Sequence, residues 1–394
     1  MPFFSVLIAT YNRCDLLPRA VESVMSQTFA DFEVIISDDC STDQTAQVAE
    51  ELTKKDKRIR YFKNEKNLGS VANSKKMAME YATGKYCIYL CDDDYFTDPD
   101  CLDEVYVAAQ SSTDIGYITG CSDIVNDDGT FLKKNCHGLP SGTYSGKRIL
   151  LDHKLFLSFN AAFTERNILK KIYSDVADDN LSSDAEIVLS IHASDCKTAY
   201  INKVFACWVQ SDDSYGFAEM EKYPAKLMCS LDGYWKARNK FKNEELQRYD
   251  ELHFVPKLLE IIMKLVVSGI DVKTAFLSIE KRCAGIEEYF QAEVAAAEHI
   301  FKPEGKNAVF GYGFLGSLFC RLLDKFNIKY DIIDDNPQIS AVRMSEVKQN
   351  EYGMCAITVS DSEVFKKISA KLSEKNILSA GLKESVFSVL LSAL

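Results

Sequence analysis

Short apolar segments alternate with amphipathic segments through the first 95 residues of the chain. The apolar segments have the length of buried strands and cover residues 3–9, 32–37, 60–62 and 86–90. Between them apolar residues recur at helical spacing, over residues 16–25, 42–52 and 71–82. Apolar strands that alternate with amphipathic helices are typical of a parallel sheet covered on both faces by helices. The pattern therefore predicts an α/β fold.

The pattern changes twice further along the chain. From about residue 222 to residue 301, long helical segments laced with Lys and Glu predominate. The strand and helix alternation then resumes, with strands predicted over 307–310 and 330–333 and a helix between them. A length of 394 residues suits two or three domains. We therefore predict an α/β domain over residues 1–215, a helical region over 216–302 and a small α/β module over 303–394.

Composition and charge exclude several classes of protein. The chain has 58 acidic and 46 basic residues and a net charge of −12, so nucleic acid is not an expected partner. The N-terminus lacks the cationic segment of a signal peptide, and the apolar stretch around Lys264 is too short to span a bilayer. The 13 cysteines are scattered and have no paired CxxC spacing. We therefore predict a cytoplasmic protein whose cysteines are reduced thiols.

Residues 222–242 form a cationic stretch in this acidic chain. Its one acidic residue is Asp232, and aromatic residues lie among its six basic ones, which are Lys222, Lys226, Lys236, Arg238, Lys240 and Lys242. Such a stretch is suited to peripheral contact with an anionic membrane surface. The more common alternative is a solvated helix face whose aromatic residues, Tyr234, Trp235 and Phe241, belong to an ordinary core.

Polar residues follow three of the predicted strands, and they are Thr10-Tyr11-Asn12, Asp38-Asp39 and Asp92-Asp93-Asp94. Ligands of open α/β sheets bind outside the carboxyl ends of the strands, so we expect these five carboxylates on one rim. Because side chains alternate along a strand, Asp92 and Asp94 are expected to face one side and Asp93 the other. Hard oxygen ligands suit Mg²⁺ or Mn²⁺ bridged to phosphate, and the alternative is a solvated acidic loop.

Four segments carry a resemblance to a known family, and they are SVLIATYNR, SVMSQTFADFEVIISDDCSTDQT, NEKNLGS and ATGKYCIYLCDDDYF. In order and spacing they resemble the family 2 glycosyltransferases, whose nucleotide-sugar-binding domain has the GT-A fold. The resemblance covers about residues 1–215. It implies an inverting enzyme that uses a nucleotide-sugar, with UDP-sugar as the expected donor and Mn²⁺ or Mg²⁺ as the expected cofactor.

The resemblance also implies roles for the residues at the strand ends. Thr10, Tyr11 and Asn12 would line the base pocket, and Asp39 would accept a hydrogen bond from the uracil imide. Either Asp93 or Asp92 would approach the ribose. Asp94 would hold the metal on the diphosphate, with Asp92 as a second candidate ligand. These roles agree with the chemistry, because uracil offers an N–H donor and Tyr11 offers a stacking face.

The general base implied by the resemblance is an acid that opens an amphipathic helix. Asp184 fits that position best and Glu186 second, although Ser183 stands where an acid is usual. The alternative for Asp184 is an ordinary first-turn acid favoured by the helix dipole. Relatives often have a histidine near 208–213, where this chain has none, so we expect water and Asp212 or Asp213 to complete the metal shell.

The resemblance further implies a glycan or lipid-linked saccharide acceptor at the inner face of a bacterial membrane, and hence a peripheral location there. We expect the donor sugar to be read by residues around Phe159-Asn160-Ala161. Neither the sugar nor the acceptor hydroxyl follows from the sequence.

A glycine pattern near the C-terminus suggests a second nucleotide site. Gly311, Gly313 and Gly316 follow a predicted strand and open a helix, and Asp334 ends the next strand. Only about 60 residues follow Asp334, too few for a complete dinucleotide-binding domain. The segment resembles small Rossmann-like modules of bacterial sugar-processing enzymes, and a structural or regulatory role is the alternative to nucleotide binding. Two further hypotheses for the whole chain are an NAD(P)-linked sugar oxidoreductase and a non-catalytic glycan-assembly scaffold.

Overall fold

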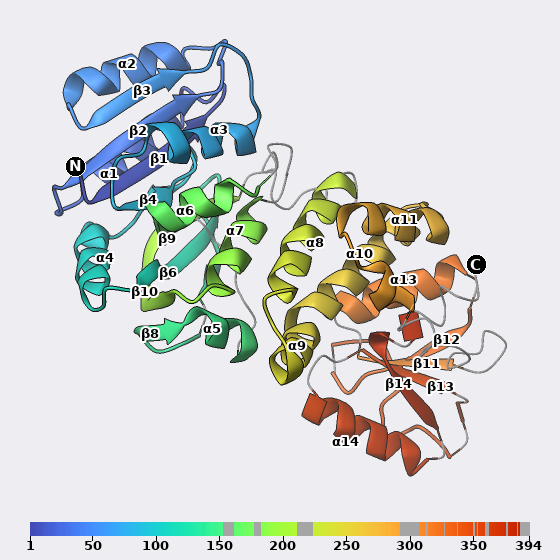
Figure 1. The fold of residues 1–394 in the computed structure, drawn as a ribbon. Helices are drawn as coiled ribbons and strands as arrows, with labels where there is room; N and C mark the ends of the chain where they lie inside the picture. The colour runs from blue at the N-terminus through green and yellow to red at the C-terminus, as the bar shows by residue number, and fades with distance from the viewer. Residues whose placement is uncertain are drawn as a thin grey trace. The chain divides into compact units, whose positions relative to one another are not determined.

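The computed structural model divides into two compact units. Unit 1 comprises Met1–Glu219 with Lys236–Glu245, and unit 2 comprises Met220–Trp235 with Leu246–Leu394. Each unit has its own sheet (Figure 1). The structure describes residues 1–136, 138–152, 161–176, 183–210, 224–291, 307–311, 314–326, 328–336, 338–349, 351–352, 354–358, 362–375, 377–383 and 385–386. The division into three domains stays a prediction.

Unit 1 is built on a ten-stranded sheet. Eight strands follow the order β3-β2-β1-β4-β9-β6-β10-β5, and the other two pair with members of this row, β7 with β6 and β8 with β10. Its strands are β1 (Phe4–Thr10), β2 (Phe32–Asp38), β3 (Ile59–Lys63), β4 (Tyr86–Tyr89), β5 (Tyr95–Phe96), β6 (Ile115–Asn126), β7 (Phe131–Asn135), β8 (Gly142–Ser145), β9 (Ala162–Glu165) and β10 (Lys197–Gln210). The first four are parallel, as predicted, and β9 and β5 join the sheet antiparallel.

Helices cover this sheet on both faces (Figure 1). Within unit 1 they are α1 (Leu17–Met25), α2 (Thr45–Lys55), α3 (Ser70–Lys76), η1 (Met77–Tyr81), α4 (Cys101–Gln110), α5 (Gly146–Asp152), α6 (Arg166–Tyr173) and α7 (Ser183–His192). Val6 and Ile8 of β1 belong to one core cluster and Leu7 to another, because alternate side chains of a strand point to opposite faces. Burial on both faces explains the continuous apolar pattern of these strands, and the predicted α/β class is confirmed.

Unit 2 combines helices with a small parallel sheet of order β12-β11-β13-β14. Its described strands are β11 (Asn307–Phe310), β12 (Tyr330–Ile333), β13 (Met354–Ile357) and β14 (Leu378–Gly381). The helices outside unit 1 are α8 (Pro224–Arg238), whose last turn is grouped with unit 1, α9 (Asn243–Tyr249), η2 (Asp250–Phe254), α10 (Val255–Val267), α11 (Val272–Arg282), α13 (Phe314–Lys325) and α14 (Ser362–Ser373). Asp271 caps α11 by accepting a hydrogen bond from the Thr274 amide at 2.9 Å.

The expectation that all cysteines are reduced is wrong for one pair. Cys121 and Cys136 form a disulfide. The antiparallel register of β6 and β7 pairs Ser122 with Asn135, which places the two cysteines opposite each other as the next pair along the hairpin. The other cysteines of the described residues are free. The spacing of cysteines in the sequence could not reveal this pair, because it depends on strand register.

Two aromatic residues of the cationic stretch are buried, and Tyr234 is half-buried. Trp235 and Phe241 are buried, and the indole N–H of Trp235 donates to the Ala284 carbonyl at 3.0 Å. The interpretation of this stretch as a helix with core aromatics therefore fits these two residues, and they offer no apolar surface to a membrane. The described helices include none that is long and apolar enough to cross a bilayer.

Candidate functional site

The polar rim forms where β1, β2 and β4 end in unit 1. Thr10 pairs with Asp38 in the parallel register, and the Asp39 amide donates to the Thr10 carbonyl at 2.9 Å. On the other side of β1, the Leu90 amide donates to the Leu7 carbonyl at 3.0 Å, which starts the acidic turn beside the same strand. The sheet therefore brings the three strand ends together, as the sequence pattern predicts.

The segment after β1 is locked to the segment after β2. Asn12 has a φ of 53°, a left-handed conformation that Asn tolerates better than most residues. Its amide donates to Ser41 Oγ at 2.9 Å, and its Oδ1 accepts from the Thr42 amide at 2.8 Å. These bonds hold neighbouring Tyr11, which is 45% exposed, at the surface of the rim. Asn12 thus has a structural task, and the ring of Tyr11 is accessible for stacking.

The two aspartates after β2 differ in what they bind. The carboxylate of Asp38 is fully buried and accepts from the Ser41 amide at 2.7 Å and from the Tyr61 hydroxyl at 2.7 Å. Burial and this hydrogen bond to Asp38 raise the pKa of Tyr61. Asp38 is therefore committed to holding the loop together.

Asp39 organises the loop between β3 and α3. Its Oδ1 accepts from Asn64 Nδ2 at 2.9 Å and from the Leu68 amide at 2.8 Å, and its Oδ2 accepts from the Gly69 amide at 2.8 Å. A carboxylate has about four acceptor positions, so these three bonds leave one on Oδ2. Asp39 can accept one more hydrogen bond without losing its structural partners.

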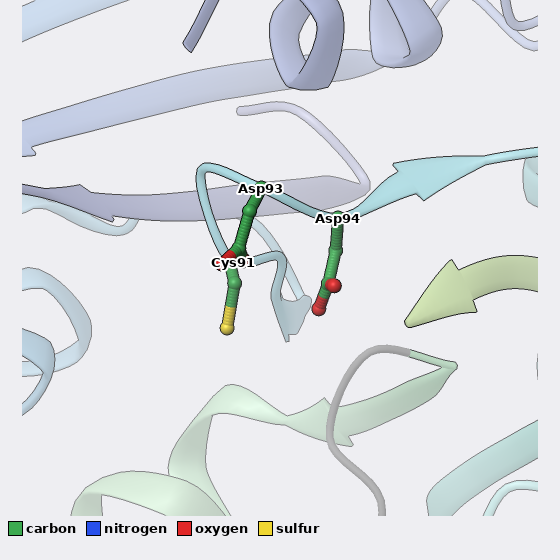
Figure 2. A group of neighbouring side chains, drawn as sticks. All are labelled: Cys91, Asp93 and Asp94. Carbon is green, nitrogen blue, oxygen red and sulfur yellow. The ribbon is translucent and has the colours of Figure 1, made fainter. Parts of the chain in front are cut away.

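The acidic segment after β4 is a tight turn and not a continuation of the strand. β4 ends at Tyr89, and the Asp94 amide donates to the Cys91 carbonyl at 3.1 Å. The expected alternation of Asp92, Asp93 and Asp94 therefore does not occur. Instead the Cys91 Sγ and carboxylate oxygens of Asp93 and Asp94 lie within 4.8 Å of one another (Figure 2). Asp92 is not part of this group of described residues.

Asp94 is anchored from across the sheet. The side chain is almost completely buried, and its Oδ1 accepts a hydrogen bond from the Val209 amide of β10 at 2.9 Å. Because Val209 is 115 residues away in sequence, this bond exists only in the folded sheet. It fixes the orientation of the carboxylate that the family resemblance implies as the metal ligand.

Two arginines balance the charge of the turn. Arg13 Nη1 lies 2.6 Å from Asp93 Oδ2 and 3.7 Å from Asp92 Oδ1, and Arg19 Nη2 donates to the Asp93 carbonyl at 2.6 Å. Asp92 is 6% exposed, and burial raises its pKa to about 6, although the Thr10 hydroxyl and Arg13 oppose the shift. The sequence pattern singled out neither arginine nor Cys91, although Arg13 directly follows Thr10-Tyr11-Asn12.

The chemistry of this donor set fits a divalent cation. Two carboxylates with one sulfur close by are concentrated in a turn whose main compensating charge comes from Arg13 on Asp93. A cation placed among them would relieve the remaining repulsion. Asp93 and Asp94, with Cys91 beside them, are the residues that could hold it.

The two candidate bases on α7 have different surroundings. Asp184 is exposed, whereas Glu186 is buried and its Oε1 lies 2.5 Å from Lys236 Nζ. Asp184 is also close enough to Tyr173, which is buried in the core, to act on it electrostatically. Burial raises the pKa of Tyr173, and the charge of Asp184 adds to that shift. The ring centre of Tyr173 is 6.4 Å from that of Tyr89, the last residue of β4.

Several sequence-predicted positions lie outside the described residues. These are Phe159, Asn160, Asp212, Asp213, Gly313 and the side chain of Ser183. Ala161, the last of the three expected to read the donor sugar, is buried.

The C-terminal glycines satisfy packing demands. Gly311 has a φ of 90°, and a Cβ at Gly316 would lie 2.0 Å from the Gly311 carbonyl oxygen. The hydroxyl of Thr358, after β13, donates to that same carbonyl. Asp334 Oδ1 accepts from the Asn336 amide at 2.8 Å. These contacts explain two of the glycines without a ligand, and a nucleotide site here stays a prediction.

The rim of unit 1 combines a parallel α/β sheet, an exposed aromatic beside a buried carboxylate, and an acidic turn after the fourth strand. The architecture of unit 1 is that of the GT-A fold. Residues 5–173, which lie in unit 1, match the model of Glycosyl transferase family 2.

Two similar proteins illustrate the match. GalNAc(5)-diNAcBac-PP-undecaprenol beta-1,3-glucosyltransferase of Campylobacter jejuni is 40% identical over 94 residues, which are 24% of this chain and 30% of that protein. The Escherichia coli enzyme WfaP, a UDP-Glc:alpha-D-GlcNAc-diphosphoundecaprenol beta-1,3-glucosyltransferase, is 40% identical over 96 residues, 24% of this chain and 37% of WfaP. The matches thus span about a third of the length of these relatives.

Solved structures of other proteins have a similar fold. The mannosyltransferase PcManGT of Pyrobaculum calidifontis, solved with GDP-Man and Mn²⁺, aligns with a TM-score of 0.51 at 15% identity. The alignment covers 83% of this chain and 86% of PcManGT. It supports the fold assignment.

Proposed function

We propose that the chain is an inverting glycosyltransferase that transfers a sugar from a UDP-sugar to a hydroxyl of a glycan or lipid-linked acceptor. The observation that carries the proposal is the acidic turn Cys91–Asp94, held by Val209 and Arg13 on the same rim as Asp39. In a family 2 domain, this rim offers a nucleotide pocket and a diphosphate site side by side.

The nucleotide part of the proposal rests on Asp39 and Tyr11. The remaining acceptor position of Asp39 suits the imide N–H of uracil, and the exposed ring of Tyr11 suits stacking on a base. Thr10 and Asn12 frame the pocket. Asp92 or Asp93 would accept from the ribose hydroxyls.

A divalent metal, Mn²⁺ or Mg²⁺, would be held by Asp94 and Asp93 at the turn. When bound, such an ion neutralises charge on the departing diphosphate. The Mn²⁺ in the P. calidifontis structure supports metal use in this fold. Arg13, already 2.6 Å from Asp93, supplies permanent positive charge beside the same group.

Asp184 would act as the general base. It removes the proton from the acceptor hydroxyl as that oxygen forms its bond to the anomeric carbon. The bond between the anomeric carbon and the phosphate oxygen breaks on the opposite face, and UDP leaves with the electron pair. The proton ends on the Asp184 carboxylate. Because the acceptor oxygen attacks opposite the leaving UDP, this single displacement inverts the configuration at the anomeric carbon. The exposure of Asp184 favours it over Glu186, which is buried against Lys236.

The acceptor is proposed from the relatives. The names of the C. jejuni and E. coli enzymes specify saccharides linked through diphosphate to undecaprenol. By analogy, we propose a lipid-linked or lipopolysaccharide-type acceptor at the inner face of a bacterial membrane, with the enzyme bound peripherally. The role would be in surface polysaccharide synthesis.

The test is a screen of UDP-sugars with the full-length protein and Mn²⁺, in which released UDP is measured with and without lipid-linked saccharides. We expect turnover with one or a few UDP-sugars, and its loss in Asp94→Asn. Asp56→Asn is the matched control. Asp56 lies in the loop before β3, at the N-terminal ends of the parallel strands, whereas the rim lies at their carboxyl ends. If no UDP-sugar is bound or turned over, the proposal is wrong.

A further inference from the structure

Cys91 is an exposed residue in the middle of the acidic turn. Among the free cysteines of the described residues it is the exposed one, and the others are buried or half-buried. The turn hydrogen bond between the Asp94 amide and the Cys91 carbonyl brings the two residues close together. Figure 2 shows the sulfur on the same side of the turn as the carboxylates of Asp93 and Asp94.

The two carboxylates are already oriented by partners outside the turn. Val209 of β10 holds one oxygen of Asp94, and Arg13 holds one oxygen of Asp93. These bonds set the orientation of both carboxylates. The donor atoms of the three side chains lie within 4.8 Å of one another. Metal–oxygen and metal–sulfur bonds of about 2.0–2.3 Å span such distances after small side-chain rotations.

We propose that Cys91 is a third protein ligand of the divalent-cation site, which makes this a mixed sulfur and oxygen site. The inference rests on the proposed function for the presence of a metal at Asp94, and adds the sulfur ligand. Thiolate is a soft donor, so the site favours Mn²⁺ over Mg²⁺ and binds Co²⁺, Zn²⁺ and Cd²⁺ still more tightly. On binding, a metal–sulfur bond forms and the thiol proton passes to the buffer.

Spectroscopic titration of the full-length protein with Co²⁺ and Cd²⁺ tests the ligand directly. With Co²⁺ we expect a thiolate charge-transfer band in the near ultraviolet for the wild type, and its loss in Cys91→Ser. Cys196→Ser is the matched control. Cys196 precedes β10 and its Sγ lies 3.4 Å from the Ile191 carbonyl, outside the rim. This variant should keep the band.

Affinities give a second readout. Cys91→Ser should weaken Cd²⁺ binding about tenfold or more, while Mg²⁺ binding changes less than about twofold, because Mg²⁺ gains little from sulfur. Bound Cd²⁺ should also protect Cys91 from alkylation by N-ethylmaleimide, as located by peptide mass spectrometry. The inference is overturned if the wild type shows no charge-transfer band, or if Cys91→Ser binds Cd²⁺ as tightly as the wild type.

Transfer assays in Mn²⁺ and in Mg²⁺ separate this inference from the proposed function. If the wild type transfers sugar and Cys91→Ser keeps the same ratio of Mn²⁺-supported to Mg²⁺-supported rates, sulfur ligation is wrong and the proposed function stands. If the wild type forms the Co²⁺–thiolate band but turns over no UDP-sugar, the sulfur ligand stands and the proposed function is wrong.

Discussion

The ammonium nitrogen of Lys236, at the end of α8, lies 2.5 Å from the Oε1 atom of the buried Glu186 on α7, and Lys236 itself is partly exposed. Asp184 is only two positions earlier on the same helix, yet it is exposed. Residues two positions apart on an α-helix point about 200° away from each other, so one faces the core when the other faces outward. The helix therefore separates the two candidate bases, and the ion pair commits Glu186 to structure.

The first prediction distinguishes the two acids. Asp184→Asn should lower kcat at least about 100-fold with little change in KM for the donor, because a general base contributes 10²–10⁴-fold. Glu186→Gln should keep a rate within a few-fold of the wild type. Steady-state kinetics measure both, and circular dichroism confirms that each variant is folded. A wild-type rate for Asp184→Asn would show that the base is elsewhere.

The second prediction concerns the ion pair itself. Lys236→Met leaves the buried Glu186 carboxylate without its ammonium partner and should destabilise unit 1 by about 1–3 kcal/mol, less than for a fully buried pair because Lys236 is partly exposed. Adding Glu186→Gln should recover part of the loss, since the unpaired charge is gone. Calorimetry on the single and double variants measures the coupling. Strictly additive effects would mean that the contact contributes nothing.

A third prediction tests the base pocket. Asp39→Asn replaces one carboxylate oxygen by an NH₂ group, which cannot accept a hydrogen bond. The remaining oxygen cannot accept from both the loop donors and the uracil imide N–H, so UDP affinity should fall about tenfold or more. CDP lacks the imide N–H, so the preference for UDP over CDP should also shrink. Isothermal titration calorimetry of both nucleotides gives the ratio. If the wild type does not distinguish UDP from CDP, Asp39 does not read the base.

The fourth prediction concerns how the stability of unit 1 depends on pH through Glu33 of β2. Burial alone would raise its pKa, but hydrogen bonds from Thr83, Ser5 and Arg60 outweigh burial and lower it. A carboxyl whose pKa is lower in the folded protein stabilises the fold above the unfolded-state pKa, and this stabilisation is lost as pH falls through the folded-state pKa.

We therefore expect Glu33→Gln to reduce the stability of unit 1 by about 1–3 kcal/mol at pH 7, because Thr83, Ser5 and Arg60 lose a charged hydrogen-bond acceptor. The difference from the wild type should shrink as the pH is lowered below about 4. Melting temperatures measured from pH 7 to pH 3 test this. A difference that stays constant over that range would contradict the assignment.

A fifth prediction concerns the C-terminal glycine turn. Gly316→Ala places a methyl group against the Gly311 carbonyl and should destabilise unit 2 by about 1–3 kcal/mol or more. Gly142→Ala is a useful comparison, because its nearest contact would be 3.6 Å away at Tyr144. That substitution should change stability by less than about 0.5 kcal/mol. Equal melting temperatures for Gly316→Ala and the wild type would show that the turn can yield.

Much of the candidate site could be predicted from strand ends. Runs such as FSVLIAT and FEVIISD are apolar because both faces of a central parallel strand are buried, so their ends are visible in the sequence. Carboxyl ends of parallel strands share one edge of the sheet. Asp39 directly follows β2, and Asp94 belongs to the acidic turn after β4, so the sequence suffices to predict that the two share a rim.

The sequence by itself thus determined the α/β class, the polar rim and the set of acids on it, because these follow from short-range periodicity. Only the tertiary structure decided what each acid touches. The turn at Cys91–Asp94 replaced strand alternation, Lys236 reached Glu186 from 50 residues away, and Val209 reached Asp94 from 115. Such partnerships depend on strand register and helix packing across the whole unit, and no local pattern of hydrophobic and polar residues encodes them.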